Sequence, residues 1–205
     1  MMVWYASYGS NLLRARFMAY IAGGSPPGEA FSQAGCNDPT PPREDRPLTI
    51  PHRLYFAQRS ANWENGGVCF IRRGAEPGVE TLGRIYLITE SQFTEVFYQE
   101  NGWSGFRDLP PPVKPGHPLH LDLGRVPAMG ALKTEAPGWY STLLNLGEVQ
   151  GHPIFTFTAS WDEDRIPKIP PGPRYRDTIV RGMKECYGLP DQEIRAYLDR
   201  CSPGS

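Results

Sequence analysis

The most informative part of this sequence is VWYASYGSNL, the stretch from Val3 to Leu12. Residues 3–8 are apolar and aromatic, which predicts an opening β-strand. The turn-forming residues Gly9-Ser10-Asn11 interrupt this strand, and large apolar residues then recur at helical spacing as far as Ile21. The chain is therefore expected to begin with a strand, a tight turn and a helix.

The turn at Gly9-Ser10-Asn11 is a candidate binding site. A strand-to-helix turn that contains glycine exposes consecutive backbone N–H groups and the positive end of a helix dipole. Such groups can hold a carboxylate, a phosphate or a developing oxyanion. The alternative is an ordinary turn in which Ser10 or Asn11 caps the helix. The stretch is neither a P-loop nor a GxSxG nucleophile elbow.

The composition predicts a domain of the α+β class. The 205 residues include 22 glycines and 22 prolines, well above an ordinary combined share of roughly 12%, which argues against a helical bundle. A hydrophobic content of 40% argues against disorder. Periodicity predicts further strands at residues 53–58, 66–72, 82–88, 119–123 and 154–160, and helices at residues 176–187 and 191–201.

Two proline-rich segments interrupt these elements. Residues 25–51 hold many Pro, Gly and Asp and few large apolar side chains. They predict a loop insertion at the surface of a single domain over residues 1–205, poorly ordered or folded over the mouth of a pocket. Residues 109–118 contain several prolines and cannot form a helix.

A helix that begins with a capping box at Thr89 carries a carboxylate at an unusual place. Phe93, Val96 and Phe97 define its buried face, and Glu100 occupies the next position of that face. A buried carboxylate is costly unless it has a partner or a role, and desolvation would raise its pKa toward that of a general acid or base. The alternative is that Glu100, at the helix end, turns to solvent.

Charge, cysteine and histidine usage limit the classes of partner. The formal net charge is −1, so no basic surface for nucleic acid is expected. No targeting signal and no membrane-spanning stretch is visible, so a cytoplasmic location is expected. No metal site and no cofactor is expected either, and the oligomeric state is left open. The lack of CxxC spacing favours free thiols over two disulfides for Cys36, Cys69, Cys186 and Cys201.

Four landmarks resemble, in their order, the gamma-glutamylcyclotransferase family. Members of this family have YGSNL after the first strand, W…GG before a middle strand, a catalytic Glu on the helix after a G-x-x-(W/Y) strand, and a pocket-lining Tyr in P-x-P-x-Y. The resemblance runs from about residue 3 to residue 198 around the insertion. The matching residues are Tyr8–Leu12, Trp63 with Gly66-Gly67, Gly83–Tyr86 with Glu100, and Pro171–Tyr175.

The resemblance implies a small mixed β-barrel core flanked by helices, with one open cavity. It implies an enzyme that releases 5-oxoproline and a free amine or amino acid from a γ-glutamyl substrate, because the α-amine of the γ-glutamyl group attacks its own γ-carbonyl. Glu100 would be the catalytic acid and base. The substrate-binding residues that it implies are Tyr5, Ala6, Ser7, Tyr8, Gly9, Ser10, Asn11, Leu12 and Tyr175.

Two other functions for the same cavity stay open. One is another amide or acyl hydrolysis with Ser10 as nucleophile, although no His stands in an assignable partner position. The other is a non-catalytic module that binds a metabolite. Release of 5-oxoproline distinguishes cyclisation from hydrolysis, and tight binding without turnover marks the binding module.

Overall fold

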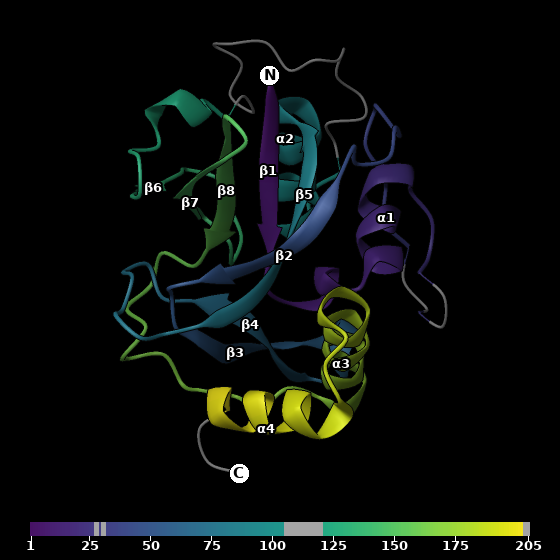
Figure 1. The fold of residues 1–205 in the computed structure, drawn as a ribbon, viewed down its shortest axis with the longest axis vertical. Coiled ribbons are helices and arrows are strands. Elements are labelled where there is room, and N and C mark those ends of the chain that lie inside the picture. Colours follow the sequence, from purple (N-terminus) through teal and green to yellow (C-terminus); the bar gives the residue numbers. More distant parts are fainter. Residues whose placement is uncertain (27–28, 30–31, 105–120, 203–205) are drawn as a thin grey trace. The chain divides into compact units, whose positions relative to one another are not determined.

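A computed structural model describes residues 1–26, 29, 32–104 and 121–202. Its elements follow the chain in the order shown in Figure 1. They are β1 (Met2–Ser7), η1 (Ser10–Leu12), α1 (Arg14–Ala22), β2 (Asp45–Ile50), β3 (Leu54–Ser60), η2 (Ala61–Trp63), β4 (Gly66–Ile71), β5 (Thr81–Thr89), α2 (Glu90–Glu100), η4 (Leu123–Arg125), β6 (Ala131–Lys133), β7 (Thr142–Val149), β8 (His152–Thr158), α3 (Pro173–Tyr187) and α4 (Asp191–Cys201).

The strands form a mixed α+β fold with one main sheet. Six strands lie in the order β2-β5-β1-β8-β7-β6, and β3 pairs with β4 in a second sheet. β1 runs parallel to β8, with Trp4 opposite Ile154, and β7 is antiparallel to both β6 and β8. Over the described residues β2 and β6 remain at the edges, so the sheet is not closed. The predicted small β-barrel core is therefore not confirmed.

The chain divides into two compact units. Unit 1 consists of Met1–Ala6, Met18–Asp45 and Ile85–Ser160, and unit 2 consists of Ser7–Phe17, Arg46–Arg84 and Trp161–Ser205. The chain passes from one unit to the other within β1, α1, β2 and β5, and once more shortly after β8. The single domain over residues 1–205 stays a prediction, and each unit is described in turn.

Aromatic side chains form the core of unit 1. The ring of Tyr5 in β1 stacks on the rings of Tyr86 and Phe157, with centroids 6.5 and 5.4 Å apart. Phe93 of α2 meets the Tyr5 ring at 6.0 Å. Aromatic pairs at these separations add about 0.5–1.5 kcal/mol each beyond their area burial. These contacts hold α2 against the sheet.

α2 begins as predicted and is buried more widely than predicted. The Gln92 N–H donates to Thr89 Oγ1 at 3.1 Å and the Thr89 N–H donates to Gln92 Oε1 at 3.0 Å, which confirms the capping box. Burial is not limited to one apolar face, because Glu95 and Gln99 are buried as well. The Glu95 carboxylate accepts from the backbone N–H and the side-chain amide of Asn37 at 2.7 and 3.0 Å.

Part of the predicted loop insertion at residues 25–51 is regular structure. The backbone N–H of Cys36 donates to the carbonyl of Ile21 at 2.8 Å, and the Cys36 side chain is buried. Residues 45–50 form β2, so the loop prediction is wrong there. The strand was not predicted because it contains Pro47, which argues against a strand. β2 lies at the edge of the sheet, and an edge strand tolerates a proline because not all of its N–H groups have to pair.

Unit 2 combines the β3–β4 hairpin with α3 and α4. The hairpin pairs Leu54 with Ile71 and Ser60 with Gly66, and a bulge at Gln58 (φ 59°) shifts its register. α3 starts at Pro173, three residues before the predicted helix start at residue 176, because proline fits the first turn of a helix. It ends where predicted, and Gly188 follows it in the left-handed conformation (φ 66°).

Further predictions concern the cysteines, residues 109–123 and membrane-spanning helices. All four cysteines are free. The strand predicted at residues 119–123 is wrong in its described part, because Leu123 begins the 3₁₀ turn η4. Residues 109–118 lie outside the described residues. Among the helices that are described, none has the length and hydropathy to cross a membrane.

Candidate functional site

The Gly9 turn is a 3₁₀ turn that no side chain caps. Gly9 has φ −124° and ψ −140°, and the N–H groups of Leu12 and Leu13 donate to the carbonyls of Gly9 and Ser10 at 3.0 and 3.2 Å. No capping bond from a side chain is formed, so the alternative of a Ser10 or Asn11 cap is wrong. The carbonyls thus close the turn, and the side chain of Ser10 has another role.

Backbone donors remain available at the start of the turn. Within the described part of the chain, no hydrogen bond uses the N–H groups of Gly9 and Ser10. Ser10 is buried and Gly9 is half-buried. Buried backbone donors are almost always paired, so these two N–H groups are candidate donors to an acceptor from outside the protein, a ligand or water. A carboxylate or an oxyanion carries the lone pairs and charge that such donors favour.

Tyr175 lies directly against this turn. A Cβ atom built on Gly9 would lie 2.9 Å from the hydroxyl oxygen of Tyr175 and 3.3 Å from Cβ of Cys69, so a side chain at this position would displace the Tyr175 hydroxyl. The hydroxyl of Tyr175 accepts from the backbone N–H of Cys69 at 3.1 Å. The structure therefore brings together two predicted site elements, YGSNL and the tyrosine of PGPRY, and adds β4 to them.

α3 supports the turn from a second point. A Cβ on Gly182 would lie 2.5 Å from the carbonyl carbon of Leu12, so the helix backbone approaches the turn closely. Arg84 of β5 donates to the Leu12 carbonyl at 3.0 Å and forms an ion pair with Glu185 of α3 at 2.7 Å. α3 and β5 together fix the carbonyl side of the turn and leave its N–H side unobstructed by these contacts.

The glycine pair Gly66-Gly67 packs against the segment that precedes α3. A Cβ on Gly66 would lie 2.7 Å from Cα of Gly172, and a Cβ on Gly67 would lie 2.9 Å from the carbonyl carbon of Ile169. The glycine pair therefore lets the segment before α3 pack directly on β4. This packing places Tyr175, three residues after Gly172, at the turn.

Arg16 is a site residue that the sequence analysis did not single out. It is 3% exposed, and its Nε–H donates to Ser10 Oγ at 2.8 Å. Its guanidinium lies 4.8 Å from the ring centroid of Trp63, and the Trp63 ring lies 4.8 Å from that of Tyr175. A charged residue on the apolar face of a helix was the signal that drew attention to Glu100. The same signal would have found Arg16, which stands three residues after Leu13 on an apolar helix face.

The other predicted substrate-binding residues are buried. Tyr5 and Ala6 belong to unit 1, where Tyr5 is part of the aromatic core. Ser7, Tyr8, Asn11 and Leu12 belong to unit 2 and surround the turn in the chain. A role in substrate binding stays a prediction for each of them.

Glu100 is the last residue of α2 and belongs to unit 1. It is half-buried, and the residue after it anchors the helix end. The side-chain amide of Asn101 donates to the carbonyls of Phe97 and Tyr140 at 3.0 and 3.2 Å, and its oxygen accepts from the Tyr140 N–H at 2.9 Å. Glu100 therefore extends from a fixed backbone. Its proximity to the Gly9 turn, which is in unit 2, stays a prediction.

No metal-binding cluster is formed by the residues that the structure describes, since three or more His, Cys, Asp or Glu side chains do not gather at any one place there. The groups suited to a ligand are instead backbone N–H groups, the hydroxyl groups of Ser10 and Tyr175, and the buried guanidinium of Arg16. These donors fit an anionic or carbonyl-containing organic molecule.

Comparisons with known proteins identify the fold. No family model matches the chain. The structure named "Gamma-glutamyl cyclotransferase" aligns with a TM-score of 0.52 and 20% identity, covering 100% of this chain and 90% of that chain. An uncharacterized protein from Homo sapiens gives the same TM-score, identity and coverage.

A sequence relative is much longer than this chain. The protein named "Histone deacetylase 5" from Arabidopsis thaliana is 37% identical over 207 aligned residues, which cover 97% of this chain. The chain spans only 30% of that relative's length. The structural matches, at 20% identity, establish the architecture alone. This chain therefore has the fold of the gamma-glutamyl cyclotransferase structure, in a mixed α+β arrangement.

Proposed function

We propose that the protein is a gamma-glutamyl cyclotransferase, an enzyme that converts a γ-glutamyl amine or peptide into 5-oxoproline and a free amine or amino acid. The observation that carries the proposal is the pair of unused N–H groups at Gly9 and Ser10, next to Tyr175, in a chain with the fold of a gamma-glutamyl cyclotransferase structure.

The reaction makes limited demands on the protein. The α-amine nitrogen forms a bond to the γ-carbonyl carbon of the same molecule, and the bond from that carbon to the leaving nitrogen breaks. No water is consumed. Because attack is intramolecular, much of the entropic cost is met by the substrate itself. The enzyme has to remove a proton from the amine, stabilise the oxyanion and protonate the leaving nitrogen.

Each requirement has a candidate group in this chain. The N–H groups of Gly9 and Ser10 would donate to the oxyanion of the tetrahedral intermediate. Glu100 would take the proton of the α-amine and pass it to the leaving nitrogen. Tyr175 and Arg16 would hold the turn in place, because one lies against Gly9 and the other donates to Ser10.

Hydrolysis with Ser10 as nucleophile has less support. The oxygen of Ser10 accepts a hydrogen bond from Arg16 Nε at 2.8 Å. A guanidinium is a donor without acceptor capacity and cannot remove the proton of a serine hydroxyl. A serine nucleophile needs an adjacent base, and Arg16 does not supply one.

The sequence relative is named as a histone deacetylase, which makes deacetylation a reaction to assay but not a second proposed function. No contact among the described residues favours deacetylation in this chain. The alignment covers nearly all of this chain and 30% of the relative. We infer that the relative contains a segment with this fold. An acetyl-lysine peptide is included in the substrate panel to test whether this chain removes acetyl groups.

The proposal is tested with a panel of γ-glutamyl amines and γ-glutamyl dipeptides, with 5-oxoproline and the free amine both quantified. Two matched controls define the reaction. An N-acetyl-γ-glutamyl amide lacks the attacking amine and should give no product, although a hydrolase would still cleave it. An α-glutamyl dipeptide places the amide at the wrong carbonyl and should be inert. Cleavage of the N-acetyl compound, or release of glutamate in place of 5-oxoproline, would overturn the proposal.

A further inference from the structure

Glu64 adopts a backbone conformation that residues with a side chain normally avoid. It follows η2 in the connection from β3 to β4 and has φ 56° and ψ 31°, in the left-handed region. Glycine adopts this region readily, whereas a residue with a Cβ atom does so at a cost in free energy. Residues held in such conformations cluster at functional sites. The Glu64 side chain is therefore expected to make a contact that glycine could not make.

The Glu64 carboxylate caps α3 from a distant part of the chain. Its Oε2 atom accepts from the backbone N–H of Arg174 at 3.1 Å, across 110 positions of sequence. The N-cap residue of α3 is Gly172, which has no side chain to serve as a cap, and Pro173 has no N–H. Arg174 therefore carries the first N–H group of the helix. A carboxylate also interacts favourably with the positive end of the helix dipole.

Neighbouring contacts bring the same two segments together. A Cβ on Gly172 would lie 2.7 Å from the carbonyl oxygen of Trp63 and 3.2 Å from Glu64 Oε2. The lack of a side chain there lets the carboxylate reach the helix. The Arg174 guanidinium lies 5.8 Å from the Trp63 ring centroid, and the Tyr175 ring lies 4.8 Å from it. Trp63 and Glu64 thus contact the start of α3 at three points.

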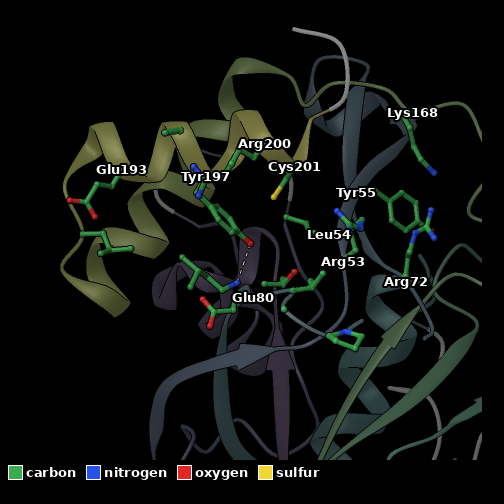
Figure 2. Close-up of a pocket in the computed structure, with 17 residues that line it drawn as sticks. Arg53, Leu54, Tyr55, Arg72, Glu80, Lys168, Glu193, Tyr197, Arg200 and Cys201 are labelled. Atoms are coloured by element: carbon green, nitrogen blue, oxygen red, sulfur yellow. Dashed lines mark hydrogen bonds between the residues drawn. The ribbon is translucent and has the colours of Figure 1, made fainter. Parts of the chain in front are cut away.

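The segment before α3 is held separately at its other end. The N–H of Ile169 donates to the carbonyl of Phe56 at 3.0 Å, and Lys168 Nζ lies 4.2 Å from the ring centroid of Tyr55. Figure 2 shows Lys168 beside the Tyr55 ring, where both line a pocket of unit 2. β3 therefore fixes where this segment begins, and Glu64 fixes where the helix begins.

Tyr175 connects the start of α3 to the Gly9 turn. Its hydroxyl accepts from the Cys69 N–H at 3.1 Å, and a Cβ on Gly9 would lie 2.9 Å from the hydroxyl oxygen. Tyr175 directly follows Arg174, whose N–H is bonded to Glu64. The carboxylate thus fixes the backbone one residue before the tyrosine.

We propose that Glu64 is a positioning residue of the candidate site. By capping α3 it holds the Tyr175 hydroxyl against Gly9 and Cys69, and it does not itself contact the substrate. This placement of Tyr175 is independent of the reaction that the protein performs. The effect of Glu64 on catalysis rests on the proposed function, because there the Gly9 turn supplies the donors to the oxyanion.

Three substitutions at Glu64 separate the cap from the backbone strain. Glu64→Gln keeps an oxygen that can accept from the Arg174 N–H. Glu64→Ala removes this acceptor and keeps the strain. Glu64→Gly removes both the acceptor and the strain, so it should unfold at a higher urea concentration than Glu64→Ala.

The backbone amide of Cys69 reports the position of Tyr175 without any substrate. Its ¹H resonance depends on the hydrogen bond to the Tyr175 hydroxyl. Glu64→Ala and Glu64→Gly should both move this resonance upfield, because the bond lengthens, and Glu64→Gln should leave it near its wild-type position. The control is Glu80→Ala, which removes an exposed carboxylate from the pocket wall in Figure 2 and should not move the resonance.

Kinetics extend the test to the reaction. The kcat for release of 5-oxoproline should fall about tenfold in Glu64→Ala and equally in Glu64→Gly, and Glu64→Gln should restore it. A purely stabilising role predicts instead that activity follows the urea midpoint, with Glu64→Gly more active than Glu64→Ala.

Three results would overturn the proposal. The first is a Cys69 resonance that stays in place in both Glu64→Ala and Glu64→Gly. The second is a displacement that is present in Glu64→Ala and absent in Glu64→Gly, because it would then follow stability. The third is a displacement in Glu64→Gln as large as in Glu64→Ala. Should Glu64→Ala fail to fold, Glu64→Gly and Glu64→Gln decide. A wild type that releases no 5-oxoproline would refute the proposed function alone, and the Cys69 resonance would still decide the role of Glu64.

Discussion

Gly182→Ala tests whether the close approach of α3 fixes the turn. Two effects oppose each other at this position. Alanine is favoured over glycine inside a helix by about 1 kcal/mol. A new Cβ atom would lie 2.5 Å from the carbonyl carbon of Leu12 and 2.7 Å from its Cβ, whereas carbon atoms in optimal contact are about 3.5–4.0 Å apart.

The steric effect should prevail in this variant. The helix would have to move by roughly 1 Å to restore ordinary contact distances, and the atoms that it meets belong to the backbone and Cβ, which have no rotamer by which to escape. Overpacking costs about 1–3 kcal/mol, and contacts this short belong to the upper part of that range, about 2–3 kcal/mol. After the helix-propensity gain of about 1 kcal/mol, the net loss in unfolding free energy should be about 1–2 kcal/mol.

Urea unfolding followed by circular dichroism measures this loss. The matched control is Arg181→Ala, at the neighbouring exposed position of the same helix, which should stay within about 0.5 kcal/mol of the wild type. Under the proposed function, Gly182→Ala should also raise KM for the γ-glutamyl substrate. A Gly182→Ala variant as stable as the wild type, or more so, would refute the close approach of α3 to Leu12.

Three other variants test separate parts of the structure. Ser10→Ala leaves the backbone N–H groups in place, so 5-oxoproline release should persist; loss of activity in a folded variant would instead indicate a serine nucleophile. Arg16→Lys keeps a positive charge but loses the planar group over Trp63 and the Nε donor, and urea unfolding should show a loss of about 1–2 kcal/mol. Burial would raise the pKa of Glu163, but hydrogen bonds from Arg73 outweigh it and lower that pKa to about 2, below an unfolded value of about 4.3. The stability advantage of the wild type over Glu163→Gln should therefore be complete above about pH 5 and disappear as the pH falls toward 2; an advantage of constant size in urea unfolding between pH 7 and pH 2 would contradict this.

Local sequence signals predicted the elements whose patterns are self-contained. β1 is a run of apolar residues that ends at Gly9, and α2 begins with a capping box that both side chains complete. β2, β6 and β7 were missed. β2 contains Pro47, β6 has three residues, and β7 has an irregular register next to Gly147. In each case the strand depends on its neighbours in the sheet more than on its own pattern.

The candidate site shows the same division between local and long-range information. The turn and Glu100 could be located from residues that are adjacent in the chain. The contacts of Gly182 with Leu12, and of Tyr175 with Cys69, connect residues more than a hundred positions apart. Nothing in a single sequence indicates which glycine meets which backbone, so these supports became apparent only from the fold.

The central claim is that Glu100 transfers the proton in an intramolecular cyclisation. The most direct test is the rate of 5-oxoproline release by the wild type and by Glu100→Gln, on the best γ-glutamyl substrate of the panel. Glutamine keeps the shape of the side chain and cannot accept the proton, so kcat should fall by about 10²–10⁴ while ligand binding persists. An undiminished kcat in Glu100→Gln would contradict the account.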